Sequence, residues 1–68
     1  MLNVTAQVVG GRKQVLELSE GSTVKDAMQA IGLEGSYSAS VNGSPATLDE
    51  KLNDYVFVTF SEKIKGGL

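Results

Sequence analysis

The chain contains neither cysteine nor histidine. Without these residues it cannot form a disulfide, bind zinc through the usual ligands, or supply a thiol nucleophile or an imidazole base. The common catalytic groups that remain are carboxylates, lysines, hydroxyls and two tyrosines. If this protein takes part in sulfur or thioester chemistry, the reactive cysteine must therefore belong to a partner.

Positive charge and long apolar runs are also scarce. Six Lys and Arg residues are spread along the chain against eight Asp and Glu, for a net charge of -2. Nucleic-acid-binding domains carry a concentrated basic surface, so we expect no nucleic-acid partner. No apolar run approaches the length that spans a membrane, and residues 1–4 do not resemble the start of a signal peptide. These absences predict a cytoplasmic protein with no membrane partner.

The chain is short, with 68 residues. That length is enough for one domain with a modest hydrophobic core, and it leaves little room for an enclosed active site. We therefore expect that the chain is not an enzyme in its own right.

Alternation of apolar and polar residues predicts the strands. It runs through residues 2–9 and resumes over 14–19, and Gly10-Gly11 between them is typical of a hairpin turn. A short strand is expected over residues 37–41, and a last one over 55–60. In the last strand, Val56, Val58 and Phe60 fall on one face, while Tyr55, Phe57 and Thr59 fall on the other.

A helix is predicted to start at Thr23, because Asp26 follows three residues later as in a capping box. Gly32 is suited to end this helix, and Leu33 is expected to fold back onto it. The apolar residues at helical spacing are Val24, Ala27, Met28 and Ile31.

The segment between the third and last strands carries mixed signals. Asn42-Gly43 is a strong turn signal, and Pro45 is expected to close the segment. Residues 47–52 are expected to form a single helical turn that carries Leu48 and Leu52 to the core.

These elements predict an α+β fold in which one helix packs across a mixed sheet of four to five strands. The domain is expected to cover residues 1–60. After Phe60 the chain becomes polar and then glycine-rich, which predicts a flexible C-terminal tail over residues 61–68 that carries Gly66 and Gly67.

Four segments of the chain follow one another in an order that is found in a known family. They are Gly21-Ser22-Thr23-Val24-Lys25-Asp26-Ala27-Met28, Val41-Asn42-Gly43, Leu52-Asn53-Asp54-Tyr55-Val56-Phe57-Val58 and Lys63-Ile64-Lys65-Gly66-Gly67. With these segments the chain resembles the ubiquitin-like β-grasp sulfur carriers, a group that includes the small molybdopterin synthase subunit and the thiamine sulfur carrier. It is also similar to the archaeal small modifier proteins. Each segment is weak alone, and their order together with the terminal glycines carries the resemblance.

The resemblance implies that an E1-like enzyme adenylates the carboxylate of Gly67, with Gly66 as a slim neck. The adenylate is then converted to a thiocarboxylate, or transferred to a lysine as an isopeptide. The carrier binds no cofactor itself, because ATP and magnesium are used by the partner enzyme. Other implied partners are a synthase subunit and a processing protease. The same chemistry serves molybdopterin or thiamine biosynthesis, tRNA thiolation and protein tagging.

Leu68 departs from this pattern, because members that are activated directly end in two glycines. Three explanations stay open from the sequence. The chain is a precursor from which a protease removes Leu68, it is a relative that is not activated, or Leu68 is a vector-encoded residue.

A second candidate site lies on the face of the sheet that points away from the helix. Tyr55 and Phe57 are expected to be exposed there, joined by Val9 and Val15, and exposed apolar clusters often bind partners. Lys63 and Lys65 are expected to steer the tail towards an acidic groove on an enzyme. The alternative for Tyr55 and Phe57 is that they are ordinary strand residues shielded by the tail or a loop. The alternative for Lys63 and Lys65 is a solvated terminus.

Asp49, Glu50 and Asp54 lie close in sequence, but acids around a turn are more often solvated or capping groups, so we expect no metal site. Two further functions remain open. The chain could be a β-grasp interaction module without tail chemistry, or a small modifier that is conjugated to lysines of other proteins.

Overall fold

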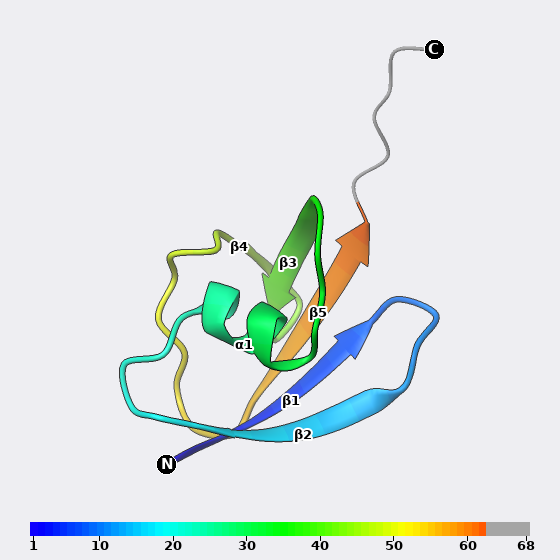
Figure 1. Ribbon diagram of the computed structural model, residues 1–68. Helices are drawn as coiled ribbons and strands as arrows, with labels where there is room; N and C mark the ends of the chain where they lie inside the picture. The colour runs from blue at the N-terminus through cyan, green and yellow to red at the C-terminus, as the bar shows by residue number, and fades with distance from the viewer. Residues whose placement is uncertain (63–68) are drawn as a thin grey trace, which may run out of the picture.

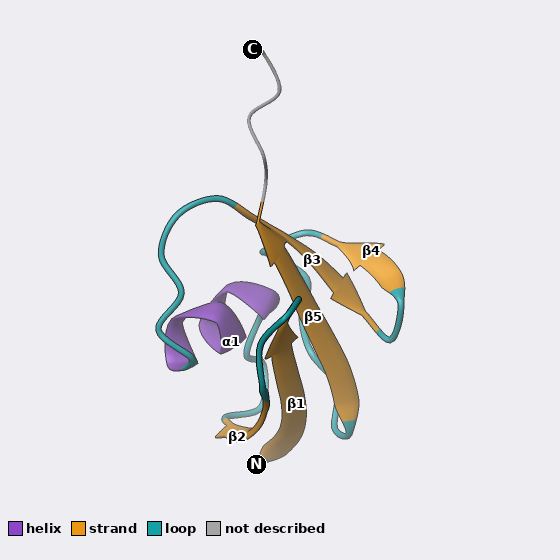
Figure 2. Cartoon of the chain, turned by 90° about the vertical axis from the view of Figure 1, so that its right-hand side faces the viewer, coloured by secondary structure: helices purple, strands orange, loops and turns teal. Residues whose placement is uncertain are grey.

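The structure is a computed structural model that describes residues 1–62. Five strands form one sheet in the order β2-β1-β5-β3-β4, in which β1 and β5 are parallel and the other neighbours are antiparallel. A single helix crosses one face of this sheet (Figures 1 and 2). The elements are β1 (Leu2–Val8), β2 (Lys13–Leu18), α1 (Val24–Ala30), β3 (Tyr37–Val41), β4 (Ser44–Ala46) and β5 (Val56–Glu62). The expected α+β architecture, a mixed sheet with one helix across it, is confirmed.

The core lies between α1 and the two central strands. Alternate residues of β1 and β5 point towards the helix, and Val4 and Phe60 are fully buried there. The parallel register places Val4 beside Val56 and Val8 beside Phe60, so the apolar rows of the two strands line up. The predicted alternation in both strands is therefore confirmed by the burial pattern.

The ends of α1 follow from its sequence. The Thr23 hydroxyl accepts a hydrogen bond from the Asp26 N–H, and the Asp26 carboxylate accepts one from the Thr23 N–H at 2.8 Å, which completes the predicted capping box. At the other end Gly32 has φ +77°. The N–H groups of Gly32 and Leu33 donate to the carbonyls of Gln29 and Met28, as in a Schellman motif. Leu33 packs against the core as predicted.

The predicted helical turn over residues 47–52 is wrong, because these residues form a turn and an extended segment. The reason lies in their carbonyl groups. Those of Leu48 and Glu50 accept from the N–H groups of Lys25 and Val24, which are among the free amides at the start of α1, each at 3.0 Å. These carbonyls are thus not available for bonds within a local helix. Leu52 is buried as expected, but Leu48 is 37% exposed.

Strand bounds also differ from the prediction. Asn42 and Gly43 both have positive φ and form a two-residue hairpin turn, so Pro45 lies within a short strand, β4, instead of closing the segment. The last strand begins at Val56 rather than at Tyr55. It continues through Ser61 and Glu62, which were assigned to the tail, because β3 pairs with it over that length.

Within residues 1–62, no helix has the length and apolar character needed to cross a membrane.

Candidate functional site

The face of the sheet opposite α1 carries a shallow depression of about 330 Å³. It spans the strands β2, β1 and β5 near the start of β5. Apolar and aromatic side chains form part of its wall, and Tyr55 and Val15 are 80% and 74% exposed. We call this feature the open-face depression. Its lining residues are Asn3, Thr5, Lys13, Val15, Tyr55, Val56 and Phe57.

Phe57 is held in place by the β3–β4 turn. The Asn42 N–H donates to the Phe57 carbonyl at 2.7 Å, and the Phe57 N–H donates to the Asn42 Oδ1 at 2.9 Å. Asn42 has φ 51°, a left-handed conformation that asparagine tolerates better than most residues. Its side chain thus continues the pairing of β3 with β5 beyond Val41, and it fixes the backbone that carries the Phe57 ring.

Tyr55 is presented by a turn that Asp54 organises. The Asp54 Oδ1 accepts from the N–H of Asn3 at 2.7 Å and from that of Tyr55 at 3.1 Å. The Tyr55 N–H also donates to the Asn3 carbonyl at 2.8 Å. Tyr55 has φ 59°, which is strained for a residue with a Cβ atom. The surrounding hydrogen bonds hold this conformation, and they leave the phenol ring in solvent.

Lys13 completes the depression from the edge of the sheet. Its Nζ lies 5.6 Å from the centroid of the Phe57 ring, within the range of a cation–π interaction. The strand register explains the contact. Lys13 is opposite Gln7 on β1, and Thr5, two residues before Gln7, lies on the same face of that strand. Thr5 is in turn beside Phe57 on β5. A cation and two aromatic rings on one surface are suited to bind an apolar side chain flanked by an acidic group.

The sequence-predicted patch is partly assembled as expected. The structure brings Tyr55, Phe57 and Val15 together at the open-face depression, although Phe57 is half-buried there rather than exposed. Val9 is exposed but lies elsewhere, in the β1–β2 turn, where its N–H donates to the Phe60 carbonyl. Sequence reasoning did not include Lys13 in this patch. Its period-2 spacing from Val15 was the signal that could have placed it there.

Five other residues with predicted roles lie outside the described part of the chain: Lys63, Lys65, Gly66, Gly67 and Leu68. Of the three neighbouring acids, Asp54 has the capping role just described. Among residues 1–62, no three acidic side chains gather as metal ligands would.

The fold of this chain is similar to that of solved structures of other proteins. No protein-family model matches the chain, and no curated protein matches it. Two solved structures of small archaeal modifier protein 1 from Haloferax volcanii are similar to it. One has a TM-score of 0.78 at 15% identity, covering 94% of this chain and 100% of that chain. The other has a TM-score of 0.74 at 17% identity, covering 96% and 99%.

At these identities the similarity establishes the fold. The chain has the ubiquitin-like β-grasp fold, which its sequence suggested. Within that fold class, its structural neighbours are small archaeal modifier proteins, and the match extends over nearly the whole of both chains.

Proposed function

We propose that this protein is a ubiquitin-like sulfur carrier or modifier whose Gly67 carboxylate is activated by an E1-like enzyme. The observation that carries the proposal is the match in fold and length to a small archaeal modifier protein, in a chain that also has Gly66-Gly67 near its end. The protein supplies no catalytic group in this scheme. The partner enzyme supplies the catalytic groups, which agrees with the lack of cysteine and histidine in this chain.

The proposed chemistry takes place in the partner enzyme. The Gly67 carboxylate attacks the α-phosphorus of ATP and displaces pyrophosphate, which leaves an acyl-adenylate. A hydrosulfide ion or a lysine amine supplied by a partner then attacks the acyl carbon and displaces AMP. The products are a thiocarboxylate and an isopeptide, respectively. Gly67 lies five residues after the end of β5, a span of at most roughly 17 Å at about 3.3 Å per residue.

Leu68 is removed before activation in this proposal. A protease hydrolyses the peptide bond between Gly67 and Leu68 and so exposes the Gly67 carboxylate. The expectation is direct: the full chain is not adenylated, and the chain that ends at Gly67 is.

The open-face depression is the proposed docking surface for the adenylating enzyme. Tyr55 and Phe57 are its aromatic anchors, and Lys13 adds a positive charge beside them. Lys63 and Lys65 would assist by directing the chain end towards an acidic groove.

The decisive experiment compares three forms of the protein with a cognate E1-like enzyme, ATP and magnesium. These are the full chain, the chain ending at Gly67, and that shortened chain carrying Gly67→Ala. We expect ATP–pyrophosphate exchange only with the unsubstituted chain ending at Gly67, because the added methyl group obstructs a slot made for glycine. Exchange with none of the three would contradict the proposal.

The intact mass of the untagged protein from its own cells gives an independent check. We expect a mass that ends at Gly67, or the heavier species in which sulfur replaces one carboxylate oxygen. A population that retains Leu68 throughout has no free diglycine end, and it would refute the proposed processing.

One observation favours a second function, an interaction module without tail chemistry. The open-face depression is a binding surface whether or not the chain end reacts. This function predicts partner binding that depends on Phe57 and is unaffected by truncation before Gly66. Isopeptide-linked remnants of the chain on other proteins would instead identify a conjugated modifier.

A further inference from the structure

The two edges of the sheet differ in their capacity to pair with another strand. The β4 edge has three residues, and its central Pro45 has no N–H to donate, so this edge is protected. The β2 edge has six residues and no proline, and five of its residues form the sequence Lys13-Gln14-Val15-Leu16-Glu17. Within residues 1–62, β2 has a neighbour on one side alone, which is β1.

The hydrogen bonds of β1 determine which backbone groups of β2 are unpaired. The carbonyl of Asn3 and the N–H of Val9 both bond to the β5 side. Because backbone groups of successive strand residues point to alternate sides, the odd-numbered residues of β1 face β5 and the even-numbered ones face β2. Leu16 and Gln14 are opposite Val4 and Ala6, so they use their backbone groups on β1. The N–H and C=O groups of Lys13, Val15 and Glu17 therefore point out from the free edge.

We propose that the β2 edge pairs with the β2 edge of a second copy of this chain, in an antiparallel two-fold dimer centred on Val15. A two-fold contact requires a self-complementary surface. In this register Lys13 of each copy is opposite Glu17 of the other, and the two Val15 residues are opposite each other. The unpaired N–H and C=O groups of these residues then meet partners across the edge.

Charge complementarity specifies both the occupant and the register. Within one copy, neither charge has an opposite charge across the strand pair, because Lys13 is opposite Gln7 and Glu17 is opposite Asn3. Centring the dimer on Val15 forms two ion pairs on the open face. A shift by two residues places Lys13 opposite Val15 or Ser19, and both ion pairs are lost.

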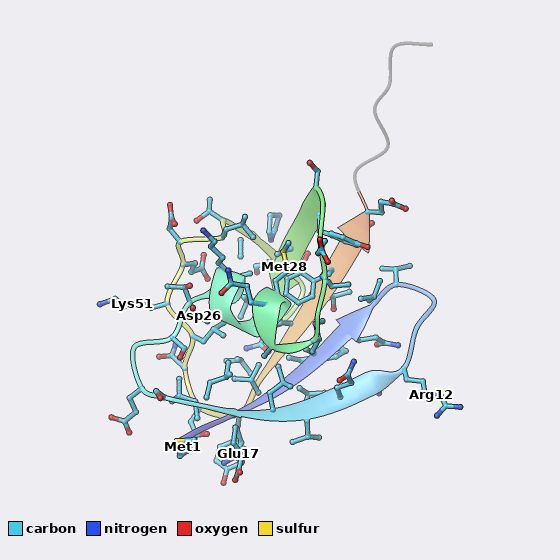
Figure 3. The ribbon with its side chains drawn as sticks, viewed as in Figure 1. Met1, Arg12, Glu17, Asp26, Met28 and Lys51 are labelled. Atoms are coloured by element: carbon cyan, nitrogen blue, oxygen red, sulfur yellow. The ribbon has the colours of Figure 1, made fainter. Side chains whose placement is uncertain are left out.

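The geometry of the side chains agrees with this pairing. Val15 is 74% exposed, and Figure 3 shows Glu17 projecting from β2 on the side away from α1. In the dimer the two exposed valines cover each other, and the two open faces become continuous. The end of β5 at Glu62 lies two strands from this edge, so the dimer contact does not cover it.

The test is sedimentation equilibrium on the full chain, from micromolar concentrations to about 1 mM, because a six-residue edge forms a small interface. Lys13→Glu and Glu17→Lys each place like charges opposite one another in the dimer. Each variant alone should self-associate about ten-fold or more weakly than the unaltered chain. An equimolar mixture of the two should associate again, since a dimer of one chain of each kind has opposite charges facing each other across the edge at both ends of the pairing.

The matched controls are Lys51→Glu and Glu34→Lys, which change the net charge equally at exposed positions away from the edge. They should leave self-association unchanged. Amide NMR shifts give a second measurement: the N–H groups of Lys13, Val15 and Glu17 should move with concentration more than those of Gln14 and Leu16.

A chain that stays monomeric up to about 1 mM would overturn the proposal. Self-association that both edge variants retain, or a mixture of the two that associates no better than either variant alone, would also overturn it. The test involves no adenylating enzyme, so its result is independent of the proposed tail chemistry.

Discussion

The two faces of the same sheet have opposite properties. On the helix face, Val4, Val58 and Phe60 are fully buried, while on the other face Val15 and Tyr55 are 74% and 80% exposed. The strands supply both faces, because consecutive side chains point to opposite sides. The helix face therefore supplies stability, and the open face is the proposed surface for recognition, so substitutions on the two faces should have separable effects.

The largest effect is expected at Phe60. Its ring is fully buried against α1, so Phe60→Ala should lower the free energy of unfolding by about 3–5 kcal/mol, which approaches the whole stability of a domain this small. Urea unfolding followed by circular dichroism measures the change. Phe57→Ala is the matched control on the open face, with an expected loss of about 1 kcal/mol. Equal losses would show that the two faces do not differ in this way.

A substitution in the turn that supports the open face should lower the free energy of unfolding by less than Phe60→Ala does. Asp54→Ala removes the oxygen that accepts from Asn3 and Tyr55, and we expect a loss of about 1–2 kcal/mol in unfolding free energy. Asp54→Asn retains an acceptor oxygen and should lose less than half as much. If the asparagine variant were as unstable as the alanine variant, the carboxylate charge rather than the hydrogen bonds would hold the turn.

A still smaller loss of unfolding free energy is expected for substitutions at the start of α1. Thr23→Ala removes the hydroxyl that accepts from Asp26, and it should cost about 1 kcal/mol. Thr23→Ser keeps the hydroxyl and should restore most of this loss in the same unfolding experiment. Partner binding through the open face should be unchanged in both, because α1 lies on the opposite side of the sheet (Figure 2).

Tyr55 gives the smallest expected change in stability and the sharpest test of the comparison. Tyr55→Gly relieves the strain at φ 59°, so unfolding free energy should stay the same or rise by up to about 1 kcal/mol. Affinity for the adenylating enzyme should nevertheless fall about ten-fold or more, as for an aromatic anchor. Calorimetric titration of the partner measures this affinity.

Tyr55→Ala is the control that separates the effect on unfolding free energy from the effect on affinity for the adenylating enzyme. It removes the ring but keeps a Cβ atom at the strained position, so it should match the glycine variant in affinity and be less stable. Unchanged affinity in both variants would remove Tyr55 from the docking surface.

Features that depend on neighbouring residues were predictable from the sequence. The capping box of Thr23 and Asp26, the end of α1 at Gly32 and the hairpin turns follow from local chemistry, and all are present. The exposure of Val15 also followed from period-2 alternation, whereas Tyr55 lies before β5 and is exposed by its turn. The prediction for residues 47–52 was wrong. Local propensity favoured a helical turn there, but the carbonyls of Leu48 and Glu50 accept hydrogen bonds from the free amides of α1, which is distant in sequence.

The open-face depression could be predicted only in part, because its residues come from three strands. Val15 and Phe57 were expected on one face, but the contact between Lys13 and the Phe57 ring depends on β1 lying between β2 and β5. No short segment specifies that order. The pairing of β1 with β5 joins residues more than 50 positions apart.

By itself, the sequence determined the alternation of the strands, the caps of the helix, the absence of cysteine and histidine chemistry, and the Gly66-Gly67 pair. These features depend on residue type and on neighbours within a few positions. The tertiary structure alone decided the strand order, the assembly of the open-face depression and the contrast between the protected β4 edge and the open β2 edge. These features depend on which distant strands pair, and burial of the shared apolar face against α1 selects that pairing.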